Sequence, residues 1–72
     1  MQVTTMRARV LRVRNNSMLV YDQNGRQTVV VNTTEALRYR PGERVCILYS
    51  GAMTRSIPPQ ITALCISRAG IC

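Results

Sequence analysis

The sequence contains no histidine, no lysine, no tryptophan and no phenylalanine. Histidine is the side chain that most often moves protons near neutral pH, and the only acidic residues are Asp22, Glu35 and Glu43. These carboxylates fall on different predicted elements, where each has an ordinary structural role. The chain also has no glycine-rich phosphate loop and no nucleophile elbow. We therefore expect that the protein is not an enzyme.

Cysteine is scarce, and Cys46, Cys65 and Cys72 form no CxxC pair. A structural zinc site needs four thiolate or imidazole ligands, so we expect neither a metal nor a cofactor. Cys46 and Cys65 fall in predicted strands, where a free cysteine usually packs as a small hydrophobe. If the last two strands form a symmetric hairpin, these cysteines lie opposite each other, in contact or, in an oxidising compartment, bonded.

Long apolar runs are missing as well. No stretch approaches the ~20 apolar residues of a membrane-spanning helix, and the first ten residues do not form a signal peptide. We expect a soluble, cytoplasmic protein without a transmembrane segment.

The length of 72 residues predicts one domain over residues 1–72. Apolar residues make up 46% of the chain, but the aromatics are only Tyr21, Tyr39 and Tyr49. The core must therefore consist mainly of aliphatic side chains, Met and Cys, which is sufficient for a small barrel. Tyr49 is expected to belong to that core.

Alternating apolar and basic residues predict a strand over residues 4–14. The apolar phase runs through Ala8 and Val10 and then shifts by one position to Leu11 and Val13. A shift of this kind indicates a β-bulge, which bends a strand strongly. The first strand is therefore expected to curve into both halves of a barrel.

Asn24 and Gly25 predict a type I′ hairpin turn, because that turn requires positive φ at both central residues. Glu35, Ala36 and Leu37 are predicted to form a short helical turn, with Thr33 or Thr34 as its cap. The remaining strands are predicted over residues 18–22, 26–32, 44–50 and 61–68. The resulting order, β-β-β, a helical turn, then β-β, matches the OB-fold. We therefore predict an all-β, five-stranded OB-like barrel, with an SH3-like barrel as the alternative.

The net charge is +7, and all ten basic residues are arginine. Such an excess favours a polyanionic partner, and the guanidinium group suits phosphate. A solvated surface and a compositional bias toward arginine are the alternatives. The candidate nucleic-acid face consists of residues from the first three strands and their turns, namely Arg7, Arg9, Arg12, Arg14, Tyr21 and Arg26.

The loop over residues 51–60 contains adjacent prolines, which stiffen it and exclude it from a paired strand. One interpretation is a rigid crossover that closes the barrel. The other is a protein-binding loop with Met53, Arg55 and Ile57 exposed at its tip, because exposed Met and Ile beside an arginine are typical of protein contacts.

The segment YSGAMTRSIPPQITA and the preceding Pro-Gly-Glu-Arg-Val are the most distinctive stretches of the chain. They resemble an uncharacterised OB-like domain family of unknown function found in envelope proteins and lipoproteins of Gram-positive bacteria. The matching positions include Tyr49, Gly51, Ser56, Pro58 and Gln60. The resemblance implies a small OB-like barrel, an envelope location and no assigned activity.

These observations predict a non-enzymatic binding or interaction module. The favoured partner is a protein or an envelope component held by the loop over residues 51–60. The alternative is a barrel that binds single-stranded DNA or RNA through its arginine-rich strands. A purely structural part of a larger assembly is the third interpretation.

Overall fold

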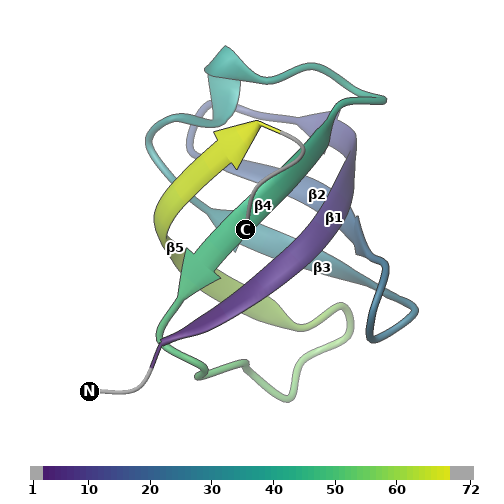
Figure 1. Ribbon diagram of the computed structural model, residues 1–72. Coiled ribbons are helices and arrows are strands. Elements are labelled where there is room, and N and C mark those ends of the chain that lie inside the picture. Colours follow the sequence, from purple (N-terminus) through teal and green to yellow (C-terminus); the bar gives the residue numbers. More distant parts are fainter. Residues whose placement is uncertain (1–2, 69–72) are drawn as a thin grey trace.

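The structure is a computed structural model that describes residues 3–68 (Figure 1). It confirms an all-β chain with one short helical turn, and each strand boundary lies within one residue of its predicted position. The elements are β1 (Thr4–Val13), β2 (Ser17–Asp22), β3 (Gln27–Asn32), the 3₁₀ turn η1 (Ala36–Arg38), β4 (Arg44–Tyr49) and β5 (Gln60–Arg68).

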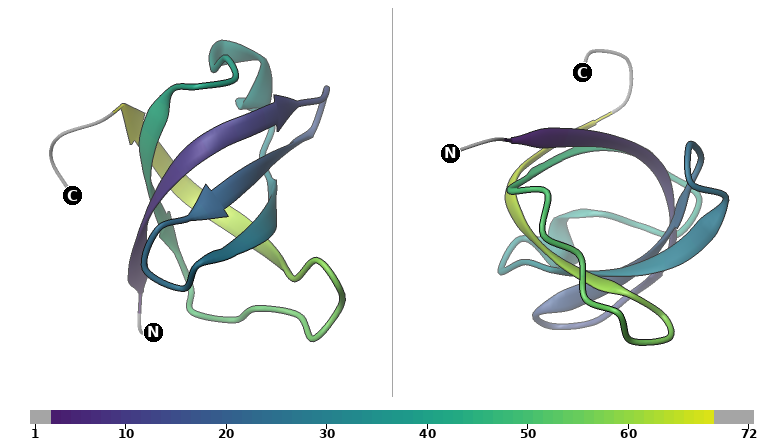
Figure 2. Two further views of the ribbon diagram at one scale, coloured as in Figure 1. Left: turned by 90° about the vertical axis from the view of Figure 1, so that its right-hand side faces the viewer. Right: turned by 90° about the horizontal axis from the view of Figure 1, so that it is seen from below.

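The five strands form one closed barrel in the order β1-β2-β3-β5-β4, and β4 pairs again with β1. All neighbouring strands are antiparallel except β3 and β5, which are parallel. The view from below in Figure 2 shows the strands as a ring. This arrangement is consistent with the predicted OB-like barrel.

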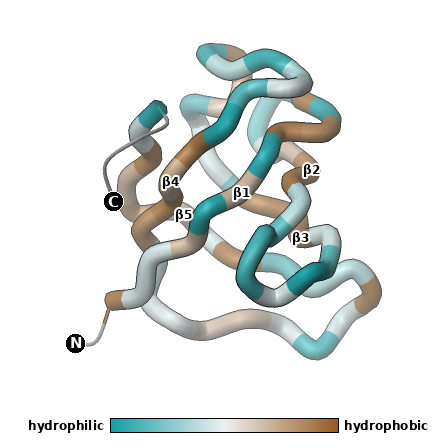
Figure 3. Tube along the Cα trace, turned by 45° about the vertical axis from the view of Figure 1, so that its right-hand side comes forward, coloured by the Kyte–Doolittle hydropathy of each residue, from teal (hydrophilic) through white to brown (hydrophobic). Residues whose placement is uncertain are grey.

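The core fills the inside of this ring with the inward-facing residues of every strand. Along β1 the alternation of apolar and polar residues is visible in Figure 3. Met18, Ile47 and Ile61 are the largest fully buried side chains. Tyr49 is 8% exposed, which confirms its predicted place in the core. The outward residues of the same strands are left to form the surface.

The predicted bulge in β1 is confirmed by a register shift between Val10 and Arg12 in the pairing with β2. Leu11, which we expected to point inward, is instead the extra residue and is 41% exposed. The bulge bends β1, so the strand pairs with β4 over its first part and with β2 over its second. Arg12 consequently returns to the outer surface, on the same side as Arg9.

The turn between β2 and β3 differs from the predicted type I′ turn. Asp22 pairs with Gln27, which makes a four-residue connection, and the positive φ falls on Arg26. Asp22 Oδ1 accepts a hydrogen bond from Asn24 N at 2.9 Å. A Cβ on Gly25 would lie 2.6 Å from Asp22 Oδ2. Gly25 is therefore needed for the close approach of a carboxylate, and not for positive φ.

The predicted opposition of Cys46 and Cys65 is wrong. Cys46 pairs with Ser67 and Cys65 with Leu48, because the connection between β4 and β5 is not symmetric. Cys65 is also a free, exposed cysteine on the outer face of β5, and not the buried hydrophobe that we expected. The two are therefore not bonded to each other. Cys72 lies outside the described residues.

Candidate functional site

The most strongly charged surface lies outside β1, β2 and β4 and the turn after β2. We call it the basic face and define it as Tyr21 together with the exposed arginines Arg7, Arg9, Arg12, Arg14, Arg26 and Arg44. It contains every residue of the predicted nucleic-acid face. Arg44 was not predicted, because only the pairing of β4 with β1 brings it to this surface.

The centre of the basic face is a row of directly opposed residues. Arg44 pairs with Arg9, and Arg9 pairs with Tyr21. The row continues from Tyr21 to Thr28 on β3. Neighbouring strands are about 4.8 Å apart, so two guanidinium groups and an aromatic ring follow one another across the barrel. Tyr21 is 38% exposed, which leaves part of its ring accessible.

A second row lies beside the first. Arg12 pairs with Leu19, and Leu19 pairs with Val30. These residues, together with Arg14, line a shallow cavity of about 210 Å³. Its half-buried aliphatic side chains offer an apolar surface next to two guanidinium groups.

The turn after β2 extends the basic face beyond the row of Tyr21. Gln23 N donates a hydrogen bond to Arg7 O at 3.0 Å, which holds the turn against β1. Arg26 lies in that turn and is exposed. The arginines thus follow the barrel from one end of β1 to the other.

The arginines of the basic face form no ion pair with any carboxylate among residues 3–68. The two ion pairs found in that range join Arg38 to Glu35 and Arg68 to Glu43. Like charges in directly opposed positions of a sheet lower stability. The basic face therefore holds concentrated positive charge that the described part of the protein does not neutralise.

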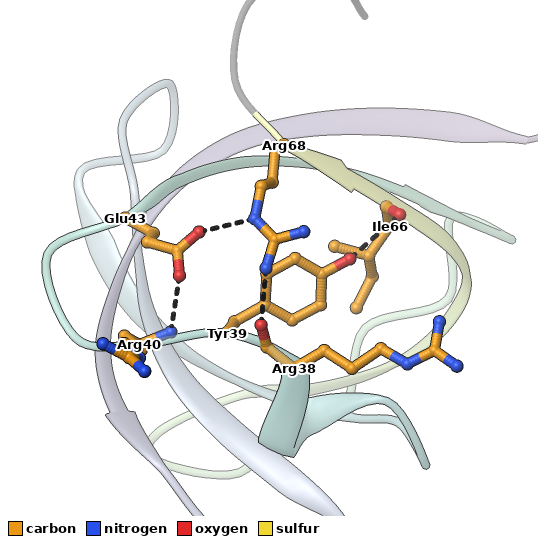
Figure 4. A network of polar contacts seen from close by, with 6 residues as sticks. All are labelled: Arg38, Tyr39, Arg40, Glu43, Ile66 and Arg68. Atoms are coloured by element: carbon orange, nitrogen blue, oxygen red, sulfur yellow. Dashed lines mark hydrogen bonds and ion pairs between the residues drawn. The ribbon is translucent and has the colours of Figure 1, made fainter.

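The arginines at the η1 end have a different role (Figure 4). The guanidinium of Arg68 stands 5.0 Å from the centroid of the Tyr39 ring and donates to Glu43 Oε2 at 2.9 Å. It also donates to Arg38 O, and Tyr39 Oη donates to Ile66 O. Burial raises the pKa of the Tyr39 phenol above its ordinary value. This network ties η1 to β5 and leaves Arg68 unavailable as a free cation.

The loop between β4 and β5 is held by its own hydrogen bonds, at the bottom of Figure 1. Thr54 Oγ1 contacts Ser56 Oγ at 2.6 Å and accepts from Gln60 N, and Ser56 Oγ donates to Pro58 O. Val30 N donates to Pro59 O, which fixes the loop to β3. The loop is therefore an ordered crossover.

The predicted protein-binding residues are only partly confirmed as exposed. Ile57 is 99% exposed, and Arg55 is also exposed. Met53 is instead half-buried, packs against the core and accepts a hydrogen bond from Gln27 Nε2 at its sulfur. The tip of the loop thus presents one apolar and one basic side chain.

The sequence did not predict a cavity of about 390 Å³ that polar and apolar side chains line together. Its polar lining comes from the β1–β2 connection, the end of β3, the segment before η1 and the middle of β5. These side chains are Asn16, Asn32, Thr33, Thr34, Glu35, Thr62 and Cys65, and Ala63, Leu64 and Ile66 of β5 supply apolar surface. They are far apart in the sequence, and only the recurrence of Asn and Thr at strand ends hinted at a shared surface.

Within residues 3–68, no group of His, Cys, Asp or Glu side chains is placed to hold a metal ion. The described part of the chain also has no helix of the length and apolar character needed to cross a membrane. Comparisons with protein-family models, curated proteins and solved structures found no match to this chain. The resemblance to an envelope-protein family therefore stays a prediction.

Proposed function

We propose that this domain binds single-stranded nucleic acid across the basic face. The observation that carries the proposal is the row of Arg44, Arg9 and Tyr21, in which unneutralised guanidinium groups stand beside an exposed ring. Guanidinium groups contact phosphates well, and exposed aromatic rings stack bases without regard to their sequence. Here two guanidinium groups and one aromatic ring stand side by side on neighbouring strands of the barrel.

Single strands fit this surface better than a duplex. Stacking on Tyr21 requires a base whose face is free, and the bases of a duplex are stacked on one another. Reading the major groove of a duplex requires a helix or a β-ribbon that enters it, whereas the basic face is the outside of a closed barrel. The apolar cavity over Leu19 and Val30 offers a second place for an unstacked base.

The proposal is tested by fluorescence anisotropy with labelled oligothymidylate and oligouridylate at a series of salt concentrations. For single strands the logarithm of the affinity falls with the logarithm of salt by about 0.7 per neutralised phosphate. The double variant R9Q/R44Q removes two phosphate contacts, so the slope is expected to become shallower by roughly 1.4.

The matched control is R40Q/R55Q, which removes the same charge from exposed arginines outside the basic face. Its slope is expected to stay close to that of the wild type. The proposed function would be refuted if the wild type did not bind the oligonucleotides at low salt. It would also be refuted if the two double variants lowered the salt slope by equal amounts.

A second candidate function is contact with a protein or envelope component through Arg55 and Ile57. It is favoured by the nearly complete exposure of Ile57 on a loop that is already ordered by hydrogen bonds, since a rigid loop loses little entropy on binding. The nucleic-acid function fits the expected cytoplasmic location, and the loop function fits the envelope location that the family resemblance implies. The variant I57S/R55S separates the two, because it is expected to leave oligonucleotide binding unchanged.

A further inference from the structure

The cavity lies over the junction of β3 and β5, beside the segment that precedes η1. Thr33 N donates to Asn16 O at 3.0 Å, which holds the end of β3 against the β1–β2 connection. Thr33 Oγ1 accepts from Glu35 N at 3.1 Å, which orders the segment that carries Glu35. The cavity is thus built on a fixed backbone.

Strand pairing places the cavity near one end of the basic face. Arg14 N donates to Ser17 O at 2.8 Å, Ser17 pairs with Asn32, and Asn32 pairs with Thr62. This row leads from the backbone of Arg14, a residue of the basic face, to the cavity within about two strand spacings, roughly 10 Å. A single strand held by the arginines therefore reaches the cavity with its next nucleotides.

The lining of the cavity suits a base and not a phosphate. Among residues 3–68 no arginine lines it, and the one charged side chain in that range, Glu35, is an acceptor. Within residues 3–68, the side chains of Asn16, Asn32 and Thr62 make no hydrogen bond to other protein groups. These amides and hydroxyls are free to bond a ligand. The volume of about 390 Å³ is at the lower end of small-molecule sites and accommodates one nucleobase.

We propose that this cavity takes a guanine base from the single strand that lies on the basic face, an inference that rests on the proposed function. Among the four bases, guanine alone presents two adjacent N–H donors on its Watson–Crick edge. An ionised carboxylate such as Glu35 accepts both. The amide nitrogens of Asn16 and Asn32 supply donors for the guanine oxygen. Thymine, cytosine and adenine each place an acceptor next to their donor and so face the Glu35 carboxylate unfavourably.

The test compares the affinities for two strands, an oligothymidylate of about twelve nucleotides and the same strand with one central dG. The wild type is expected to bind the dG strand about tenfold more tightly, as one well-formed bidentate pair provides. In Glu35→Gln the ratio of the two affinities is expected to fall close to one. The ratio of affinities is used, and not either affinity alone, because the loss of a negative charge strengthens binding to every strand.

The matched control is Arg38→Gln, which removes the ion-pair partner of Glu35 at 4.0 Å but leaves the carboxylate in place. It is expected to keep the preference for dG. If the wild type binds both strands with equal affinity and with a clear salt dependence, the guanine site is overturned and the proposed function still stands. If neither strand binds, both are overturned.

Cys65 locates the bound base directly, because it is a free, exposed thiol in the cavity lining. The dG strand is expected to slow its alkylation several-fold more than the oligothymidylate does, and Cys65→Ser identifies the labelled residue. Equal alkylation rates with the two strands bound to saturation would contradict placement of guanine in this cavity.

Discussion

Arg9 on β1 and Arg44 on β4 are directly opposed partners of an antiparallel pair. Like charges at such positions repel each other, and among residues 3–68 neither forms an ion pair with a carboxylate. The pair of Arg9 and Arg44 is therefore expected to stabilise the sheet less than an uncharged pair at the same positions would. A bound polyanion would relieve the repulsion, which links the basic face to its proposed ligand.

Arg44→Gln is expected to raise the free energy of unfolding by about 0.2–1 kcal/mol, because it removes the repulsion with Arg9. Urea denaturation at low salt measures the change, and the gain is expected to shrink at high salt as the charges are screened. Arg40→Gln is the control and is expected to leave stability unchanged. A loss of stability in Arg44→Gln would show that Arg44 has a stabilising partner.

Tyr21→Ala is expected to weaken oligonucleotide binding by about 1–3 kcal/mol, because one base loses its stacking surface. Tyr21→Phe keeps the ring and is expected to bind nearly as well as the wild type. Anisotropy titrations measure both variants, and the salt dependence of Tyr21→Ala is expected to match that of the wild type because no phosphate contact is lost. Equal affinities for the alanine and phenylalanine variants would remove Tyr21 from the site.

Gly25→Ala is expected to lower the free energy of unfolding by about 1–2 kcal/mol. The new Cβ would lie 2.6 Å from Asp22 Oδ2, so the carboxylate must move and lose its bond from Asn24 N. Asp22 is 7% exposed, which limits the room for that movement. Thermal and urea unfolding measure the effect, with Gln23→Ala in the same turn as the control. A stability equal to that of the control would mean that the turn adapts without cost.

Stability is expected to fall in alkaline solution because burial raises the pKa of the Tyr39 and Tyr49 phenols. A phenol whose pKa is raised by folding contributes stability that is fully present below its unfolded pKa of about 10. That contribution is lost as the pH rises through the folded pKa. Urea unfolding at a series of pH values, with phenolate absorbance in the folded protein, measures the decline.

Tyr39→Phe is the matching variant for this pH dependence. It removes one of the two titrations but also the hydrogen bond from Tyr39 Oη to Ile66 O. We expect a loss of about 0.5–1.5 kcal/mol at neutral pH and a shallower decline above pH ~10. A wild type with constant stability through strongly alkaline pH would contradict the burial-induced rise.

The strands and the bulge were predictable because they depend on short-range pattern. Alternation of side chains has a period of two residues in any strand, so a one-residue change of phase after Val10 indicated the bulge without knowledge of its neighbours. The pattern did not say which residue would be extra, and Leu11 was wrongly placed inside. That choice depends on the register with β2, which is a tertiary property.

The errors at the turn and at the cysteines have a similar origin. Asn24 and Gly25 were interpreted through the backbone alone, whereas the side chain of Asp22 decides the turn. The opposition of Cys46 and Cys65 assumed a symmetric hairpin, whereas the loop after β4 bonds to β3 and shifts the register of β5. Long-range contacts of this kind leave no periodic signal in the sequence.

The sequence by itself determined an all-β chain, its strands, its positive charge and most residues of the basic face, because alternation and composition are local properties. Only the tertiary structure decided that β4 returns to β1 and brings Arg44 beside Arg9. It also decided that the parallel pairing of β3 with β5 places Asn32 beside Thr62 in the lining of the larger cavity. Closure of the barrel joins strands distant in the chain, and the sites lie where those strands meet.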